Sequence, residues 1–232
     1  MCLVRHPRIS PKPLETVHTQ PNSQVLSNIS ASLTHPPAPK IDKLFIASSS
    51  LTKGIDYERF NTCLKFESCP SLANATARIQ KWPGGRARHI KDYIVPHLAE
   101  EKPTAVLVQA GGNDLAEMNK TPGSTSINSI ANDIVEIGIR AKTSGTNDIF
   151  IGSVPARSRQ YDDEQLNELN YALRTLCRRH EFVFIDNKDI TVRHLLDGVH
   201  LNKEGTSILA NNYLDALRDY YGWLVPNTPN TR

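Results

Sequence analysis

The sequence predicts an α/β fold in three layers, in which helices cover both faces of a parallel sheet of about five strands. From residue 43 onwards, short apolar runs alternate with longer segments whose apolar residues recur every three or four positions. Strands that alternate with helices pair in parallel through right-handed crossovers, so their helices lie on the two faces of the sheet. A chain of 232 residues that is 39% apolar is long enough for one such domain of about 190 residues and an appendage.

Each expected element follows from a local pattern. The strand over 104–109 is continuous, rich in β-branched residues and bounded by proline and glycine. A helix is expected over 87–101, although Pro96 should bend or interrupt it. The other expected strands cover 44–47, 73–81, 148–154 and 182–186. Three of the other expected helices cover 56–60, 162–180 and 203–223. A further helix is expected to begin at Ser124, Thr125 or Ser126 and to end near Gly145.

Composition divides the chain into three regions. Residues 1–40 contain seven of the fifteen prolines and no sustained apolar period, so we expect a flexible tail there. Residues 41–225 form the expected folded domain, and 226–232 a short C-terminal tail. The N-terminal tail holds four cationic residues and one glutamate, and the remaining 23 Lys and Arg balance 23 Asp and Glu. A neutral domain gives no electrostatic reason to expect nucleic acid as a partner.

Several classes of protein are disfavoured by what the sequence contains. The four cysteines are spaced too irregularly for a disulfide scaffold or a paired zinc site, and free thiols are expected in preference to a bridge between Cys63 and Cys69. No nucleotide-binding glycine motif or His-x-x-x-His pair is present, so neither cofactor nor metal is expected. No signal peptide or membrane span is recognisable, which favours a cytoplasmic protein. Four histidines are interpreted as surface or helix-end residues: His89, His97, His180 and His194.

Three segments that follow expected strands, or precede the last helix, contain residues suited to catalysis. The first strand ends in three serines and then Gly54. In Asp197-Gly198-Val199-His200, the carboxylate can accept a hydrogen bond from one imidazole nitrogen while the other nitrogen faces a nucleophile. The carboxyl ends of parallel strands share one edge of the sheet, so Ser50, Asn113 and His200 are expected to meet there.

These segments together resemble the SGNH hydrolases, also called GDSL esterases and lipases. The first family block, Gly-Asp-Ser-Leu-Thr, is similar to residues 48–52, and the glycine of the second falls on Gly84. The third block, Gly-x-Asn-Asp, is similar to 111–114, and the last, Asp-x-x-His, to 197–200. The resemblance covers roughly residues 43–223, and the order and spacing of the four blocks make it specific.

The resemblance implies a flavodoxin-like sheet and a serine esterase without a cofactor. Ser50 would be the nucleophile, His200 its general base and Asp197 the residue that orients the imidazole. The oxyanion would be bound by the backbone N–H groups of Ser50 and Gly84 and by the amide of Asn113. The expected substrate is a small ester, or a larger carrier that bears an acyl group such as acetyl.

The sequence departs from the family at Ser48 and Ser49, which stand where the family has glycine and aspartate. This departure motivates one alternative, a catalytically impaired binding module. It also allows a register in which Ser49 is the nucleophile, although residues 51–54 favour Ser50. The low-complexity tail suits a further alternative, an accessory esterase domain of a retrotransposon-type polyprotein, which the resemblance allows. Taken singly, Ser50 would be a helix cap, Asp197 a cap of the last helix and His200 a turn residue. Asp114 is interpreted as structural. The basic residues Arg86, Arg88 and Lys91 are interpreted first as a solvated helix face and second as a contact for a substrate carboxylate.

Overall fold

Five parallel strands form the sheet of the computed structural model, in the order β2-β1-β3-β4-β5. They are β1 (Lys43–Ser48), β2 (Thr76–Lys81), β3 (Ala105–Gln109), β4 (Asp148–Gly152) and β5 (Val183–Ile185). The predicted flavodoxin-like sheet is therefore confirmed. In this order the chain changes direction across the sheet between β1 and β3, and ligands of such sheets bind beyond the carboxyl ends of the strands at that point.

The structure describes residues 40–65, 69–158 and 163–223, all of which belong to one unit spanning residues 38–232. Apart from Lys40, the tails predicted over 1–40 and 226–232 lie outside the described residues, so both remain predictions.

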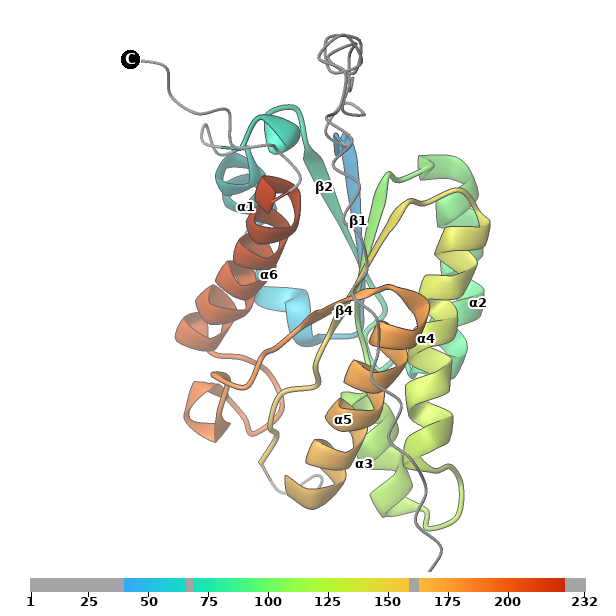
Figure 1. Cartoon of the computed structure of the whole chain (residues 1–232). Coiled ribbons are helices and arrows are strands. Elements are labelled where there is room, and N and C mark those ends of the chain that lie inside the picture. The colour runs from blue at the N-terminus through green and yellow to red at the C-terminus, as the bar shows by residue number, and fades with distance from the viewer. Residues whose placement is uncertain (1–39, 66–68, 159–162, 224–232) are drawn as a thin grey trace, which may run out of the picture. The chain divides into compact units, whose positions relative to one another are not determined.

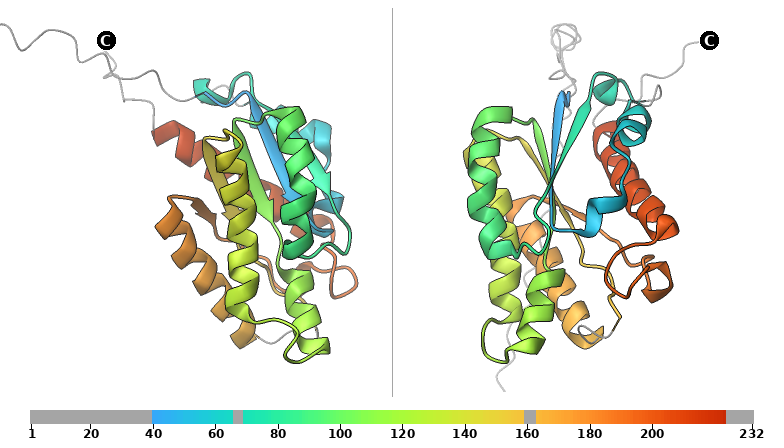
Figure 2. Two further views of the ribbon diagram at one scale, coloured as in Figure 1. Left: turned by 90° about the vertical axis from the view of Figure 1, so that its right-hand side faces the viewer. Right: turned by 180° about the vertical axis from the view of Figure 1, so that it is seen from behind.

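Helices cover the sheet on both faces (Figure 1). Within the described residues they are α1 (Tyr57–Leu64), α2 (Ala87–Glu101), α3 (Gly112–Lys120), α4 (Ile127–Thr143), α5 (Asp163–His180) and α6 (Lys203–Trp223). Figure 2 shows α2, α4 and α5 on one face, and α1 and α6 on the other. Short 3-10 helices η1 (Leu51–Gly54), η2 (Pro70–Leu72) and η3 (Val192–His194) occur in the connections.

The central strands are buried on both faces, which explains their continuous apolar sequences. Alternate residues of a strand point to opposite faces. Phe45 and Ala47 of β1 accordingly join the core beneath α2, α4 and α5, whereas Leu44 and Ile46 join the core beneath α1 and α6. The domain is thus held together by two apolar layers that share one sheet.

The boundaries show where local patterns succeeded and where they failed. Ser126 is the cap that opens α4, because its hydroxyl accepts the Ser129 N–H at 3.2 Å. Pro96 does not interrupt α2, which continues through it to Glu101 with the proline ring exposed to solvent. Helix α3 was not predicted.

Cys63, Cys69 and Cys177 are free thiols, which excludes the bridge between Cys63 and Cys69.

A buried polar network joins the carboxyl ends of the strands to α6. The Gln109 side chain at the end of β3 donates to the Ser153 carbonyl at 3.1 Å and accepts from the Tyr213 hydroxyl at 2.9 Å and the Asn187 amide at 3.2 Å. No side chain fits at Gly152, because the Gln109 amide occupies the space that its Cβ would take. Such a satisfied network fixes the edge of the sheet on which the loops are built.

Candidate active site

The three serines after β1 lie in different environments. Ser48 is fully buried, and the N–H of the buried Ser49 donates to the Gln109 carbonyl at 3.2 Å. Ser50, at the start of η1, is partly exposed, and its hydroxyl makes no capping hydrogen bond with this described helix. Ser50 thus occupies the N-cap position of η1, as the cap interpretation has it, but its side chain does not cap the helix. It is the most exposed of the three serines.

Asp197 and His200 form a closely bonded pair in the loop between η3 and α6. One carboxylate oxygen of Asp197 accepts from the His200 Nδ1 at 2.8 Å, and the other accepts the N–H groups of Val199 and His200 at 3.0 and 2.7 Å. Gly198 permits this tight turn with a φ of 81°. The hydrogen bond from the His200 ring, with those two N–H groups, holds the pKa of Asp197 far below its ordinary value. The carboxylate therefore stays ionised and leaves Nε2 of His200 facing away from it.

The alternative role of Asp197 as a cap of α6 is wrong. That helix is capped by Asn202, whose side-chain oxygen accepts the Gly205 N–H at 2.9 Å. All of the carboxylate hydrogen bonds of Asp197 described above are made within its own loop.

Gly84 and Asn113 are brought together by the loops after β2 and β3. Gly84 lies in an exposed turn with a φ of 71°, and Asn113 lies in the first turn of α3. The Asn113 Nδ2 donates to the Gly85 carbonyl at 2.9 Å, and its Oδ1 accepts from Nη1 of Arg157 at 3.0 Å. The two sequence-predicted residues are thus neighbours in the structure.

The partners of Asn113 fix the orientation of its amide. A carbonyl only accepts hydrogen bonds and a guanidinium only donates them, so the oxygen must face Arg157 and the nitrogen must face Gly85. Only 6% of Arg157 is exposed, and its guanidinium carbon would lie 2.7 Å from a Cβ at Gly112. Glycine at 112 therefore allows the guanidinium to lie against the start of α3.

An open cavity of about 670 Å³ connects the loops of the second, third and last motifs. Gly84, Asn113, Arg157 and Val199 are among the residues that line it. The loop of Val199 is tied to the loop after β4 by a hydrogen bond from Ser158 N–H to Gly198 carbonyl, 2.9 Å long. The sheet edge thus carries Asn113, His200 and Ser50. Among the described residues, however, no hydrogen bond joins the Ser50 hydroxyl to the His200 ring. In unliganded sites such bonds are often loose.

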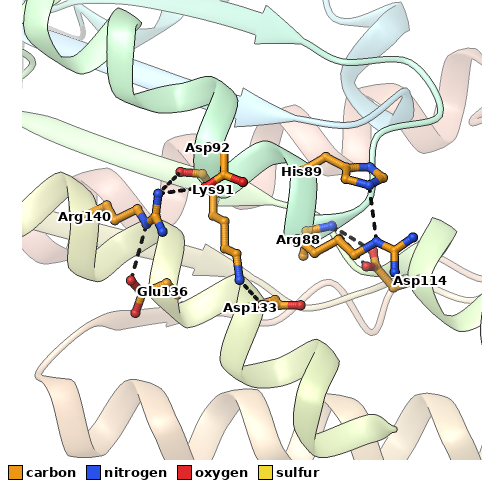
Figure 3. Close-up of polar contacts among 9 residues, drawn as sticks. Arg88, His89, Lys91, Asp92, Asp114, Asp133, Glu136 and Arg140 are labelled. Atoms are coloured by element: carbon orange, nitrogen blue, oxygen red, sulfur yellow. Dashed lines mark hydrogen bonds and ion pairs between the residues drawn. The ribbon is translucent and has the colours of Figure 1, made fainter. Parts of the chain in front are cut away.

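Asp114 has the predicted structural role. It is buried, and its carboxylate accepts the Ala87 N–H at 3.0 and 3.1 Å, which caps the amino end of α2 (Figure 3). Burial, the largest effect, raises the pKa of Asp114 from 3.8 to about 6. A buried carboxyl group with a raised pKa thus ties the start of α3 to the start of α2.

Asp114 should make the stability of the fold depend on pH. Its folded-state pKa is raised, so the folded protein binds the proton more tightly than the unfolded chain between about pH 4 and 6. Its contribution is greatest at low pH and is lost as the pH rises through 6. Relative to Asp114→Asn, which can still accept the Ala87 N–H, the wild type should lose about 2 kcal/mol of unfolding free energy between pH 4 and 7. Urea unfolding of both proteins at several pH values measures this difference, and a constant difference would refute it.

The basic residues of α2 have separate roles, so the prediction of a solvated face holds only in part. Figure 3 shows Lys91 directed toward Asp133 of α4, at 2.6 Å, while Nε of Arg88 donates to His89 at 3.2 Å. Arg86 lines the cavity and lies 3.4 Å from Glu117.

His194 lies at the end of η3, as one of the two predicted positions has it, but it is not a surface residue. Its side chain is fully buried, and Nδ1 accepts the Thr191 N–H at 3.0 Å in a capping box of η3. Its carbonyl accepts the Asn202 N–H at 2.8 Å. His194 therefore supports both ends of the loop that carries the Asp197–His200 pair.

Arg157 is a site residue that the sequence analysis missed. It follows β4 by only a few residues, and the carboxyl end of β4 lies on the same edge as those of β1 and β3. That position was the available signal, because a charged residue after a buried strand of a parallel sheet lies where ligands bind.

The described residues show neither a metal cluster nor a membrane-spanning helix. They contain no group of three or more His, Cys, Asp or Glu side chains placed to hold a metal ion. None of their helices is both long and apolar enough to cross a membrane.

Solved structures of hydrolases share this fold. A catalytic mutant of Axe2, an acetylxylan esterase from Geobacillus stearothermophilus, is 14% identical with a TM-score of 0.64, covering 77% of this chain and 95% of that one. LAE5, an α/β hydrolase enzyme from the metagenome of Lake Arreo, is 18% identical with a TM-score of 0.64, covering 81% and 98%. A GDSL-like lipase from Bacteroides thetaiotaomicron is 18% identical with a TM-score of 0.61, covering 86% and 98%. At these identities the likeness concerns the fold.

The sequence itself matches a family model. No match was found among the curated proteins. Residues 70–208, more than half of the chain, match the GDSL-like Lipase/Acylhydrolase family. The matched segment contains Gly84, Asn113, Asp197 and His200, and it begins after Ser50. The chain therefore belongs to the GDSL-like lipase/acylhydrolase family and is a carboxylic ester hydrolase.

Proposed function

We propose that this protein is a serine esterase that hydrolyses small or short-chain carboxylic esters, acetyl esters among them, through an acyl-enzyme. The observation that carries the proposal is the 2.8 Å bond between Asp197 and His200. Ser50, which is partly exposed, follows the carboxyl end of β1 at the same sheet edge. A serine, a histidine and an aspartate at one edge of a parallel sheet form the set of groups that acyl transfer requires.

The proposed reaction proceeds in two halves. Ser50 Oγ attacks the ester carbonyl carbon while His200 Nε2 takes the hydroxyl proton. The tetrahedral intermediate then collapses, the bond from carbon to the alcohol oxygen breaks, and His200 returns the proton to the departing alcohol. A water molecule repeats the sequence on the acyl-enzyme and releases the carboxylic acid. Asp197 stays ionised throughout and stabilises the imidazolium form of His200.

The negative oxygen of each intermediate would be held by three donors. They are the backbone N–H groups of Ser50 and Gly84 and the Nδ2 group of Asn113. One hydrogen of that amide already binds the Gly85 carbonyl, and the second remains for the substrate. Because the amide is fixed from both sides, little reorganisation is needed when the charge develops.

The preference for short acyl groups is supported by the openness of the site. The described connections contain no long insertion that could fold over the sheet edge as a lid. The likeness to the acetylxylan esterase Axe2 agrees with an acetyl group as the part transferred. A cavity of about 670 Å³ is far larger than an acetyl group, which favours acetyl on a larger carrier.

A second candidate, a catalytically impaired binding module, is favoured by the first motif. Ser49 replaces the acidic residue of the family pattern, and the family match begins only at residue 70. A shorter, uncharged side chain could leave Ser50 misplaced, and a displacement of about 1 Å can cost on the order of a hundredfold in rate.

Ester hydrolysis and labelling of the serine test the proposal together. The purified chain is expected to hydrolyse p-nitrophenyl acetate but not the palmitate, and a fluorophosphonate probe should label Ser50 and no other residue. Denatured protein is the control for labelling. The opposite chain-length preference would refute the short-chain specificity. Folded protein that neither hydrolyses the acetate nor reacts with the probe would favour the binding module.

A further inference from the structure

The large cavity beside Asn113 has a cationic lining. Among the described residues that line it, three are cationic, namely Arg86, Lys120 and Arg157, and one, Glu117, is acidic. They come from three different parts of the fold: the start of α2, the end of α3 and the loop after β4. The folded domain as a whole is predicted to be neutral, so this local surplus of positive charge is a specific feature of the cavity.

Within the part of the chain that the structure describes, the acidic groups offset this charge only in part. Glu117 is 3.4 Å from Arg86 in a partly exposed pair. The Asp114 carboxyl is buried and accepts the Ala87 N–H at the amino end of α2, where the positive end of the helix dipole partly compensates its charge. Lys120 is exposed and forms no ion pair with any described residue.

The cationic residues line the same cavity as two of the proposed oxyanion donors, Gly84 and Asn113. Arg157 both lines the cavity and contacts Asn113. A substrate whose carbonyl oxygen binds at Asn113 can therefore extend into a cavity that Arg86 and Lys120 also line. The volume is sufficient for a group much larger than acetyl.

We propose that this cavity binds an anionic group of the substrate, so that the preferred esters carry a carboxylate or a phosphate, with Arg86 and Lys120 as specificity-determining residues. The inference rests on the proposed esterase function, which it extends from a reaction type to a class of substrate. Because the cavity is open to water, each charge should contribute modestly, and the preference should weaken as salt screens it.

Matched pairs of esters test the proposal on both sides of the ester bond. Mono-4-nitrophenyl adipate is compared with 4-nitrophenyl hexanoate, which places the charge on the acid. 4-Acetoxybenzoate is compared with its methyl ester, which places the charge on the alcohol. For each pair, kcat/KM of the anionic ester is divided by that of the neutral ester. Comparing this ratio between wild type and variants cancels the intrinsic reactivity of the compounds.

The double variant Arg86→Gln, Lys120→Gln is expected to lower this ratio about fivefold to tenfold in at least one pair. Lys120→Glu, a single exposed change that should not affect folding, is expected to lower it at least as much as Lys120→Gln. Raising NaCl from about 0.05 M to about 0.5 M should reduce the wild-type ratio. Lys142→Gln is the control. Lys142 is an exposed cation in the last turn of α4 and is not among the residues that line the cavity, so the ratio should not change. Ratios that are the same in wild type and cavity variants, for both pairs, would overturn the proposal.

Binding to a protein that cannot react separates this inference from the proposed function. The Ser50→Ala chain is titrated with 4-acetoxybenzoate by calorimetry, with and without Lys120→Glu. Salt-sensitive binding that Lys120→Glu weakens supports the anion site even if the wild type hydrolyses nothing. Hydrolysis of neutral esters without any such binding or preference supports the esterase and refutes the anion site.

Discussion

Replacing Ser50 by alanine should lower kcat/KM for p-nitrophenyl acetate by about ten-thousandfold or more. The change removes the oxygen that would attack the carbonyl, and the remaining oxyanion donors supply only a residual acceleration. His200→Ala should have an effect of similar size, because without a base the hydroxyl keeps its proton. Residues that act as one unit are not additive, so the double variant should be hardly slower than either single variant. Initial rates corrected for spontaneous hydrolysis measure all three.

Ser49→Ala is the matched control for this prediction. It makes the same chemical change one residue earlier, at a serine that is buried. Retained activity in Ser49→Ala, together with loss in Ser50→Ala, would assign the nucleophile. The reverse pattern would place the nucleophile at residue 49. A folded wild type no faster than any of these variants would support the binding module.

The strands and long helices could be predicted because burial imposes a simple pattern on them. The central strands contact apolar layers on both faces, so their sequences are continuously apolar, and α6 spans the predicted 203–223. Helix α3 escaped prediction because Gly111 and Gly112 resemble a turn. Gly112 is instead the first residue of the helix, and a side chain there would collide with the Arg157 guanidinium. Only the tertiary structure reveals that requirement.

The candidate site was predictable where its residues are neighbours in sequence and less so elsewhere. The spacing of Asp197 and His200 allows their bond, which the structure contains. The burial of His194 depends on a local capping bond that hydropathy does not reveal. Arg157 was missed because its partner Asn113 is 44 residues away. The catalytic roles of Ser50, Asp197 and His200 remain predictions that the variants above address.

Loss of the Asn113 side chain should lower kcat about a hundredfold to a thousandfold and change KM little. Its amide is proposed to bind the oxygen that becomes negative in the transition state, and removal of one such donor has an effect of this size. Asn113→Ala is compared with wild type on p-nitrophenyl acetate across a range of substrate concentrations. A large rise in KM at unchanged kcat would instead assign Asn113 to ground-state binding.

Arg157 should act on the reaction through Asn113, as a positioning residue. Its Nη1 donates to the Asn113 oxygen, and this bond, with the one to the Gly85 carbonyl, holds the amide in a single orientation. Without the guanidinium the amide can rotate, and its donor is no longer directed at the substrate, so Arg157→Met should lose about tenfold in kcat. Arg157→Lys should recover only part of this, because a lysine lacks the planar fork of donors.

A double-mutant cycle separates positioning from general destabilisation. If Arg157 acts only by orienting Asn113, Arg157→Met should cost little further activity in a chain that already carries Asn113→Ala. If Arg157 merely stabilises the fold, the two losses should multiply, and the melting temperature should fall in both backgrounds alike. Because the guanidinium is buried, some loss of stability is expected in either case, so rates are compared at a temperature where circular dichroism shows all four proteins folded. Coupling in kcat at that temperature is the result that a purely structural role would not produce.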